Sequence, residues 1–427
     1  MRDPVYLLWD KAHIWGLTAW WALASMGVPH RLLKAADIAQ GALSGKPSSV
    51  LLAPGGTARL KSEALGAAGR AAIRAYIADG GHYLGFCGGA GLALSGNDGL
   101  GLCPWKRAAY RNRLQHFISG HIYVRTPAGH PLGFPGTETP ALPVWWPGRF
   151  DPQEAQEVEI LASYLYPAGD VWLADLPLAA LPPGTLAGWE DMYGVSFRPE
   201  ELSGQPCIIR NAYGQGSCIL SYAHLETPDS PAANRWMAHL LSALTGYAPE
   251  RECCPAWEPA GLPLRWDEPV FNELRAYLDH LIHVGCAHNL LFTRTPWLWG
   301  WRVGIPGAAL NNFFAAVCSV QSLQPNDAAL AYWEQGKALF TQKCGLFRKS
   351  AEQYLLAERL TVTLTGVLSQ AVDRRMLDMQ REALFGQPME GGGLYEELTN
   401  MLEELIFLVC ADGSAAAPYD SPPKAQA

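Results

Sequence analysis

The sequence lacks long apolar runs, clusters of basic residues and Cys-x-x-Cys pairs. A membrane-spanning helix needs about 18 or more consecutive apolar residues. No such run occurs, so no membrane partner is expected. The net charge is −8, and basic residues adjoin only in short runs such as Lys106-Arg107. Nucleic acid and anionic membranes are therefore not expected as partners.

The sequence also lacks a secretion signal. The N-terminal segment MRDPVYLLWDKAHIW carries charges in its first turns and has no small-residue cleavage site. The ten cysteines are scattered singly, apart from Cys253-Cys254. This usage predicts a reducing, cytoplasmic setting. No Walker-type G-x-x-x-x-G-K-S/T loop occurs, and no cofactor is expected.

Strands and helices alternate at the start of the chain, which at 427 residues is long enough for two or three domains of about 150 residues each. Apolar segments at 5–9, 49–53 and 82–86 are each followed by a helical stretch. Apolar strands in this alternation predict an α/β fold with a parallel sheet flanked by helices. Ligands of such sheets bind beyond the carboxyl ends of the strands. The turns after residues 53 and 86 should therefore lie on one rim.

The segment HYLGFCGGAGLAL, residues 82–94, is an apolar strand that stops at Cys87 and runs through glycines into a helical stretch. Such a turn holds its middle residue in a strained conformation and needs glycines beside it. The positive end of the helix dipole favours a thiolate there. Cys87 is therefore a candidate nucleophile. Alternatively, it is a small buried apolar residue in a glycine-rich turn.

A second candidate group follows a hairpin predicted at residues 207–222, where the chain reads A-H-L-E. A thiol nucleophile needs a base, and an imidazole serves best when a carboxylate fixes its tautomer. Residues two apart on an extended segment point to the same side. One loop can thus present His224 and Glu226 together. Alternatively, both are solvated side chains of a loop.

Three turns together resemble the class I glutamine amidotransferase fold, whose parallel sheet is flavodoxin-like. They are G-x-C-x-G after one strand, P-G-G after an earlier strand, and H-x-E near the end of the region. The sequences GFCGGA and SYAHLETP most resemble the amidotransferase-like N-terminal domain of some biotin-protein ligases and its stand-alone bacterial relatives. The resemblance covers about residues 3–248, and an α/β domain is expected at 1–248.

The resemblance implies roles for individual residues. Cys87 is then the nucleophile, His224 the general base and acid, and Glu226 the group that orients His224. The backbone N–H groups of Gly56 and Gly88 are implied as an oxyanion hole, where fixed donors stabilise developing negative charge. The implied substrate is a small-molecule or peptide amide.

The chain departs from the family pattern in two places. Leu225 stands where many amidotransferases have proline between the histidine and the glutamate. Ala90-Gly91 stands where they place a glutamine or histidine soon after the elbow. No Gly/Arg-rich loop of the G-R-G-R-x-G-R kind, which binds biotinyl-AMP, occurs in the sequence. The chain is therefore not expected to be a biotin ligase by itself.

The composition changes after residue 248. Residues 249–269 are proline-rich and predict a linker, residues 270–410 predict an all-α domain, and residues 411–427 predict a disordered tail. Leucines recur every fourth residue from Leu356 to Leu368, and Val372 continues the pattern, which predicts one apolar helix face. The predicted helices span 270–284, 307–323, 327–344, 349–385 and 394–410.

Two clusters in the predicted helical domain are candidates for a further role. The first is His280, His283, Cys286 and His288, whose spacing allows a metal site; the expectation is ordinary packing or helix-end histidines and no metal. The second is the tryptophan-rich run 297–301. It is either a docking surface or part of the core.

Two classes of function remain open. In the first, the chain is a cysteine-dependent amidotransferase-like hydrolase or transferase, which forms a thioester at Cys87. In the second, the α/β domain is a catalytically inactive binding or regulatory module. In either case the helical domain is a candidate for recruiting a protein partner or for self-association.

Overall fold

The computed structural model describes residues 5–96, 99–109, 117–153, 158–196, 198–368, 373–387 and 391–410. The chain divides into two compact units, residues 1–256 and 257–427. The boundary falls inside the proline-rich segment 249–269. The predicted tail 411–427 lies outside the described residues.

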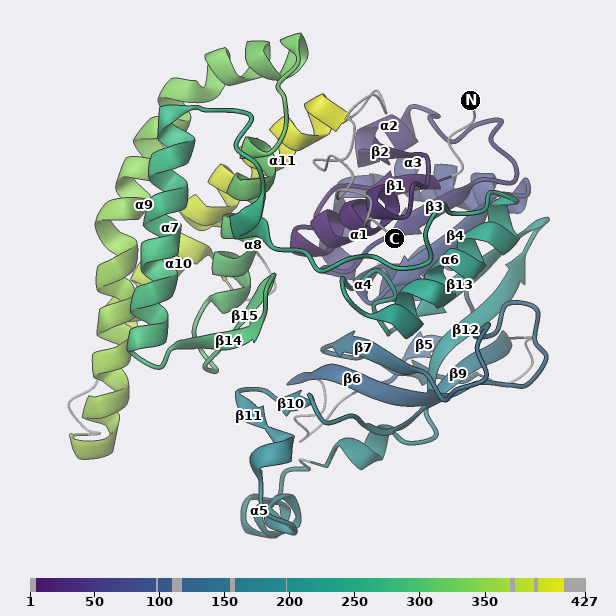
Figure 1. Cartoon of the computed structure of the whole chain (residues 1–427), viewed down its shortest axis with the longest axis horizontal. Coiled ribbons are helices and arrows are strands. Elements are labelled where there is room, and N and C mark those ends of the chain that lie inside the picture. The colour runs from purple at the N-terminus through teal and green to yellow at the C-terminus, as the bar shows by residue number, and fades with distance from the viewer. Residues whose placement is uncertain are drawn as a thin grey trace, which may run out of the picture. The chain divides into compact units, whose positions relative to one another are not determined.

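A mixed sheet of eleven strands forms the centre of the first unit (Figure 1). Its parallel part has the order β13-β4-β3-β1-β2. These strands are β1 (Val5–Leu8), β2 (His30–Leu33), β3 (Val50–Ala53), β4 (His82–Phe86) and β13 (Gly216–Ser221). The predicted parallel sheet is therefore confirmed, and the turns after β3 and β4 lie on one rim because these strands are neighbours.

Helices cover both faces of the parallel strands. Leu51, Tyr83 and Leu220 pack in one buried cluster with Ile73 and Ile77 of α3. Helices α1 and α6 contact β1 and β3. The flanking helices are α1 (Ile14–Ser25), α2 (Ala35–Ala39), α3 (Ala58–Ala78), α4 (Gly88–Ala93) and α6 (Pro231–Thr245).

An antiparallel extension continues the sheet beyond β13. Strand β12 (Pro206–Tyr213) forms a hairpin with β13 in which Tyr213 pairs with Gly216, so the predicted hairpin is confirmed. Next come β9 (Val158–Pro167) and β6 (Ile118–Arg125), which also pairs with β7 (Ala141–Trp145). The remaining elements are β10 (Trp172–Leu173), β11 (Leu176–Pro177), the pair β5 (Lys106–Arg107) and β8 (Phe150–Asp151), η2 (Leu178–Ala180), α5 (Thr185–Tyr193) and η3 (Pro199–Leu202).

The second unit is helical, as predicted. Helix α8 is buried on all sides from Leu310 to Gln321, as a central helix is. Around it lie η4 (Pro259–Gly261), α7 (Pro269–Ala287), α9 (Asp327–Val367), α10 (Arg375–Phe385) and α11 (Gly393–Cys410), with α8 itself spanning Gly307–Gln321.

Two local predictions for the second unit differ from the structure. The helices predicted at 327–344 and 349–385 are instead one helix to Val367 and a separate α10, because neither proline nor a capping residue interrupts 345–348 and Gly345 stays helical. The tryptophan-rich run forms a hairpin of β14 (Leu291–Thr295) and β15 (Leu298–Trp301). This hairpin adds a strand pair that the helical prediction lacked.

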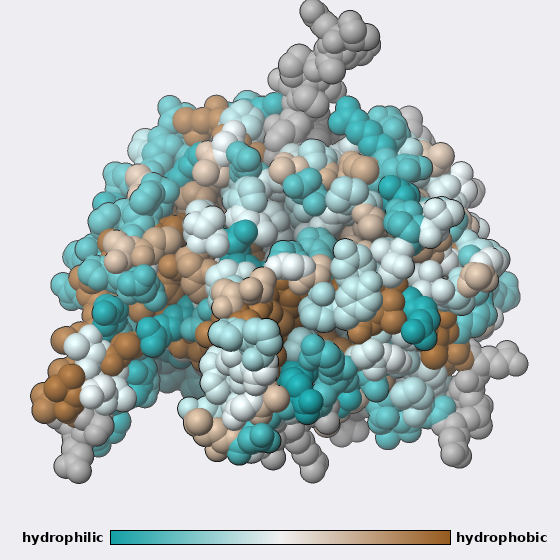
Figure 2. Space-filling view, turned by 60° about the horizontal axis from the view of Figure 1, so that its bottom comes forward, coloured by the Kyte–Doolittle hydropathy of each residue, from teal (hydrophilic) through white to brown (hydrophobic). Residues whose placement is uncertain are grey.

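The leucine stripe of α9 lies on the exposed side of the helix. Leu360 is 56% exposed and Leu368 is 55% exposed, whereas Tyr354 and Leu355 are buried. Figure 2 shows hydrophobic patches among the mostly hydrophilic residues of one face of the molecule. The stripe therefore does not pack into the second unit, and Val372 lies outside the described residues. None of the described helices is long and apolar enough to cross a membrane.

Candidate active site

Cys87 stands at the sharp turn between β4 and α4. Its backbone angles are φ 47° and ψ −107°, a left-handed conformation that is uncommon for a side chain other than glycine. The N–H of Cys87 donates to the carbonyl oxygen of Ser221 at 2.7 Å, so the turn is held by the end of β13. The predicted strand, turn and helix are present, and the turn holds up a partly exposed free thiol.

Glycines are required directly after this thiol. A Cβ atom at Gly88 would lie 1.7 Å from the carbonyl oxygen of Gly56, and one at Gly89 would lie 1.9 Å from that of Ala53. The turns after β3 and β4 are therefore in backbone contact. Among the described residues, no backbone acceptor pairs with the N–H of Gly56 or of Gly88. In the part of the chain that the structure describes, these two donors have no backbone partner, and the oxyanion hole that the resemblance implies at Gly56 and Gly88 stays a prediction.

His224 and Glu226 lie together on the loop that follows β13. The Nδ1–H of His224 donates to Oε1 of Glu226 at 2.7 Å, and their side chains are 0% and 1% exposed. The N–H of His224 donates to the carbonyl oxygen of Pro143 at 2.9 Å. A buried carboxylate thus fixes the tautomer and orientation of the imidazole. The alternative of two solvated loop side chains does not hold.

Asn234 of α6 clamps this loop. Its Nδ2 donates to the carbonyl oxygens of Leu225 and Thr227, at 3.0 and 2.9 Å, and its Oδ1 accepts from the N–H of Cys254 at 3.1 Å. The residue is fully buried. The sequence did not indicate this role, because an asparagine inside a helix has no local pattern that reveals a distant loop.

Two charged neighbours determine the protonation of His224. Burial by itself disfavours the imidazolium, but the electrostatic effects of Glu226 and Cys87 and the hydrogen bond to Glu226 raise the pKa of His224 to about 10. Nε2 of His224 is buried and has no hydrogen-bond partner within the ordinary distance limit among the described residues. The ring therefore holds a proton near neutral pH, with one nitrogen free for the Cys87 side.

Trp15 packs on His224 and contacts two further tryptophans, and we call Trp15, Trp145 and Trp146 the tryptophan cluster. The ring centroid of Trp15 lies 4.4 Å from that of His224, and 6.4 and 6.3 Å from those of Trp145 and Trp146. The carbonyl oxygen of Trp145 is 4.0 Å from Sγ of Cys87. No local sequence pattern points to Trp15, because its position beside His224 depends on the meeting of α1 with a distant loop.

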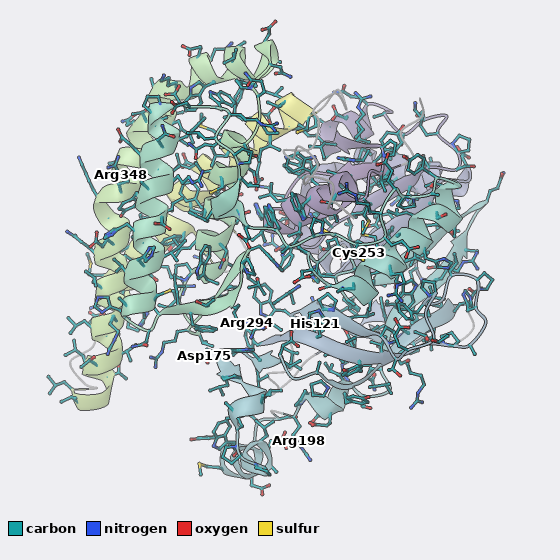
Figure 3. All side chains as sticks on the ribbon, viewed as in Figure 1. His121, Asp175, Arg198, Cys253, Arg294 and Arg348 are labelled. Carbon is teal, nitrogen blue, oxygen red and sulfur yellow. The ribbon has the colours of Figure 1, made fainter. Side chains whose placement is uncertain are left out.

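A second imidazole and carboxylate occur at His121, labelled in Figure 3. Its Nδ1 lies 2.7 Å from Oδ2 of Asp170, and its Nε2 lies 3.0 Å from Oγ of Ser230. The arrangement has the order of a serine triad, yet Ser230 is buried and the Asp170 side chain is 53% exposed. A nucleophilic serine needs the reverse exposure. His121 instead braces the residue that precedes α6.

The possible metal cluster of the second unit does not converge. Nε2 of His280 lies 3.2 Å from Oε2 of Glu352, whereas Nδ1 of His283 lies 2.8 Å from the carbonyl oxygen of Asp279. Across the described ranges, no three His, Cys, Asp or Glu side chains are grouped as metal ligands. His280 and His283 thus make ordinary polar contacts.

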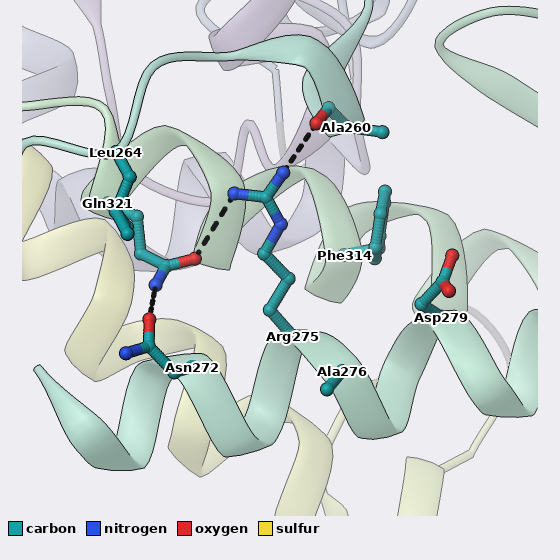
Figure 4. Close-up of a pocket in the computed structure, with 8 residues that line it drawn as sticks. All are labelled: Ala260, Leu264, Asn272, Arg275, Ala276, Asp279, Phe314 and Gln321. Atoms are coloured by element: carbon teal, nitrogen blue, oxygen red, sulfur yellow. Dashed lines mark hydrogen bonds between the residues drawn. The ribbon is translucent and has the colours of Figure 1, made fainter. Parts of the chain in front are cut away.

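A hollow of about 430 Å³ opens in the second unit (Figure 4). The guanidinium of Arg275 donates to the carbonyl oxygen of Ala260 and, at 3.4 Å, to Oε1 of Gln321. Nε2 of Gln321 donates to Oδ1 of Asn272 at 2.6 Å. No thiol or hydroxyl belongs to the residues that line this hollow. The candidate nucleophile Cys87 and the candidate base His224 both belong to the first unit.

Comparison with known proteins gives fold similarity only. No protein-family model matches the chain, and no curated protein matches it. A putative GMP synthase subunit from Thermoplasma acidophilum matches with 15% identity and a TM-score of 0.36, over 58% of this chain and 96% of that one. A putative ThuA-like protein from Bacteroides uniformis matches with 12% identity and a TM-score of 0.32, over 55% and 90%.

A beta-galactosidase from Bacillus circulans sp. alkalophilus also matches, with 12% identity and a TM-score of 0.35 over 58% of this chain. The chain spans about a third of that enzyme, 32% of its length. The elbow after β4 and the H-x-E loop after β13 are the arrangement expected of a class I amidotransferase-like fold. The chemistry of the site follows from its own side chains.

Proposed function

We propose that the first unit is a cysteine-dependent amidotransferase-like enzyme, which hydrolyses an amide or transfers its acyl group through a thioester at Cys87. The main support is the buried His224–Glu226 pair, whose free Nε2 is on the Cys87 side. A fully buried imidazole with a fixed tautomer and a raised pKa is costly to maintain in a merely structural loop.

In the proposed reaction, His224 first gives a proton to the leaving group and later takes one from the second nucleophile. Sγ of Cys87 attacks the amide carbonyl carbon, and the carbonyl electron pair moves onto oxygen, where the N–H groups of Gly56 and Gly88 stabilise it. The C–N bond then breaks as the imidazolium of His224 gives its proton to the leaving nitrogen, which leaves a thioester. His224 next takes a proton from water or an acceptor amine, and this nucleophile releases the acyl group and regenerates Cys87.

The identity of the amide is less constrained than the chemistry. The elbow is followed by Ala90 and Gly91, where amidotransferases of the resembled family place a glutamine or histidine. Glutamine is therefore one member of the substrate panel rather than the assumed substrate.

The test is acyl-enzyme formation on the full chain. The protein is mixed with a panel of primary and substituted amides, and both amine release and the intact mass of the protein are followed. We expect an added acyl mass on Cys87 and amine release that Cys87→Ala abolishes. The matched control is Cys253→Ala, because Cys253 is an exposed free thiol. Equal amine release from Cys87→Ala and the wild type would overturn the proposal.

A second candidate is an inactive binding or regulatory module. The exposed leucines of α9 favour it, because apolar stripes on a helix are common docking surfaces. It predicts that no amide acylates Cys87 and that Leu360→Lys, not Cys87→Ala, weakens self-association or partner binding. Sedimentation of the Leu360→Lys and Cys87→Ala variants tests whether the α9 leucines mediate self-association.

A further inference from the structure

We propose that the Cys87 site accepts amides with an aromatic or apolar group next to the scissile bond, and that Trp146 is the residue that selects them. This inference rests on the proposed function and deepens it by naming the substrate class. The site is thus expected to prefer such groups over the zwitterionic side of an amino acid such as glutamine.

Among other places in the described chain, backbone with positive φ occurs at the thiol and at Trp146. The residues other than glycine with positive φ include Cys87 (47°), Trp146 (60°) and Asp229 (54°), and also Lys11 (54°) and His13 (52°) in the loop after β1. Such conformations are costly and persist where the surroundings fix them, which occurs mainly at functional sites. A tryptophan is a particularly poor residue for this conformation. Its presence directly after β7 therefore calls for a reason.

The strained backbone places the Trp146 ring in the tryptophan cluster. Its N–H donates to the carbonyl oxygen of Ile118 at 2.8 Å, which holds the turn. Its ring meets that of Trp15 edge to face, with centroids 6.3 Å apart. The carbonyl oxygen of the preceding residue, Trp145, lies 4.0 Å from Sγ of Cys87. Trp146 is thus one residue from the backbone that touches the nucleophile.

The three rings differ in exposure. Trp15 and Trp145 are buried, and Nε1 of Trp145 donates to Oγ1 of Thr227 at 3.3 Å. Trp146 is partly exposed. It is therefore the member of the cluster that an incoming group can contact.

The His224–Glu226 pair of the site is already engaged. Glu226 is buried and bonded to His224, and His224 faces Glu226 and Trp15. The ammonium and carboxylate of a free amino acid need charged partners. An aromatic group instead gains from burial against indole faces, which stack edge to face or offset. The observed neighbours of the nucleophile fit the second class.

The experiment compares two alkylating reagents on the full chain: iodoacetamide and N-benzyl-2-iodoacetamide. Rate constants for Cys87 are measured by peptide mass spectrometry and divided by those for the exposed thiol of Cys253. This ratio removes the intrinsic reactivity of each reagent. We expect the benzyl reagent to be favoured at Cys87 by about tenfold, from stacking and burial on Trp146. Trp146→Ala should lose the preference and Trp146→Phe should keep most of it.

The matched control is Trp189→Ala, which removes a partly exposed tryptophan from α5 and should leave the preference intact. Thermal unfolding shows whether each variant is folded. If Cys87 reacts faster than Cys253 with both reagents but shows no benzyl preference, this inference is wrong and the proposed function stands. If Cys87 shows no enhancement with either reagent in the wild type, the proposed function itself fails. Saturable labelling by a glutamine analogue that Trp146→Ala leaves unchanged also contradicts the inference.

Discussion

His224 and His121 share one type of contact with a carboxylate but differ in their surroundings. In each, Nδ1 lies 2.7 Å from a carboxylate oxygen. The His224 and Glu226 side chains are 0% and 1% exposed, whereas those of His121 and Asp170 are 28% and 53% exposed. The imidazole–carboxylate contact alone therefore does not distinguish a reactive group from a brace.

The two histidines differ in the partner of their second ring nitrogen, Nε2, and in the burial of their side chains. Nε2 of His224 has no hydrogen-bond partner among the described residues, and the charges of Glu226 and Cys87 outweigh burial and raise its pKa to about 10. Nε2 of His121 is occupied by Ser230. At Asp170, hydrogen bonds from His121 outweigh burial and lower the pKa of the carboxyl. The raised pKa keeps a proton on His224. The contacts of His121 instead link the segments that carry Asp170 and Ser230.

The largest difference between the two pairs is expected when each carboxylate is replaced by an amide. Glu226→Gln keeps the shape of the buried pair but removes the charge that stabilises the imidazolium. We expect amide turnover to fall by roughly 10³- to 10⁴-fold, as when a triad carboxylate becomes an amide. Asp170→Asn should change turnover less than about twofold. Steady-state kinetics on both variants test this, and equal losses would contradict the distinction.

The next largest effect is expected at the elbow, within helix α4. Gly88→Ala places a methyl group 1.7 Å from the Gly56 carbonyl oxygen, so the two turns must separate and the oxyanion donors move. We expect a loss of about 10² in turnover or more and destabilisation of about 1–3 kcal/mol. Kinetics and chemical denaturation measure both quantities.

Gly91→Ala is the control for that substitution, since its Cβ would meet only the Ala58 Cβ at 3.6 Å, an ordinary contact. It should leave turnover within about twofold. A severe effect of Gly91→Ala, or a mild one of Gly88→Ala, would show that the backbone contact is not what matters.

The protonation of His224 gives a third prediction, on the pH scale. Because its pKa is raised, the ring keeps its proton above the usual value of 6.5 and loses it near pH 10. The ring nitrogens, observed by NMR in ¹⁵N-histidine protein at pH 8, should show a protonated ring. Turnover that needs this proton should fall on the alkaline side. In Glu226→Gln, burial should dominate and the ring should be neutral at pH 8.

The smallest effects are expected for polar side chains that only stabilise the loop of His224 and the segment before α6, and they concern stability. Asn234→Ala leaves the carbonyl oxygens of Leu225 and Thr227 without their donor in a buried place, which should cost about 1–3 kcal/mol of unfolding free energy. Ser230→Ala removes one contact to His121 and should cost about 1 kcal/mol. Denaturation curves rank the two, and the reverse order would show that His121 is the stronger anchor.

Sequence reasoning could identify the parts of the site that are encoded locally. Cys87 sits between glycines that the strained turn demands, and the H-x-E spacing puts two side chains on one side of a loop. Asn234 and Trp15 were missed, because each meets the loop only through the folding of distant elements. The leucines of α9 were identified as an apolar face, yet periodicity does not say whether such a face is covered.

The central claim is that His224 activates Cys87, and the pH dependence of Cys87 alkylation tests it most directly. Iodoacetamide labelling is measured from pH 5 to 10 in the wild type, His224→Asn and His121→Asn, with Cys253 as the internal reference in each digest. We expect wild-type Cys87 to remain more reactive than Cys253 at low pH, because a neighbouring imidazolium stabilises the thiolate. His224→Asn should abolish this excess and His121→Asn should preserve it. If Cys87 follows Cys253 across the whole range, or if both variants behave alike, His224 does not activate the thiol.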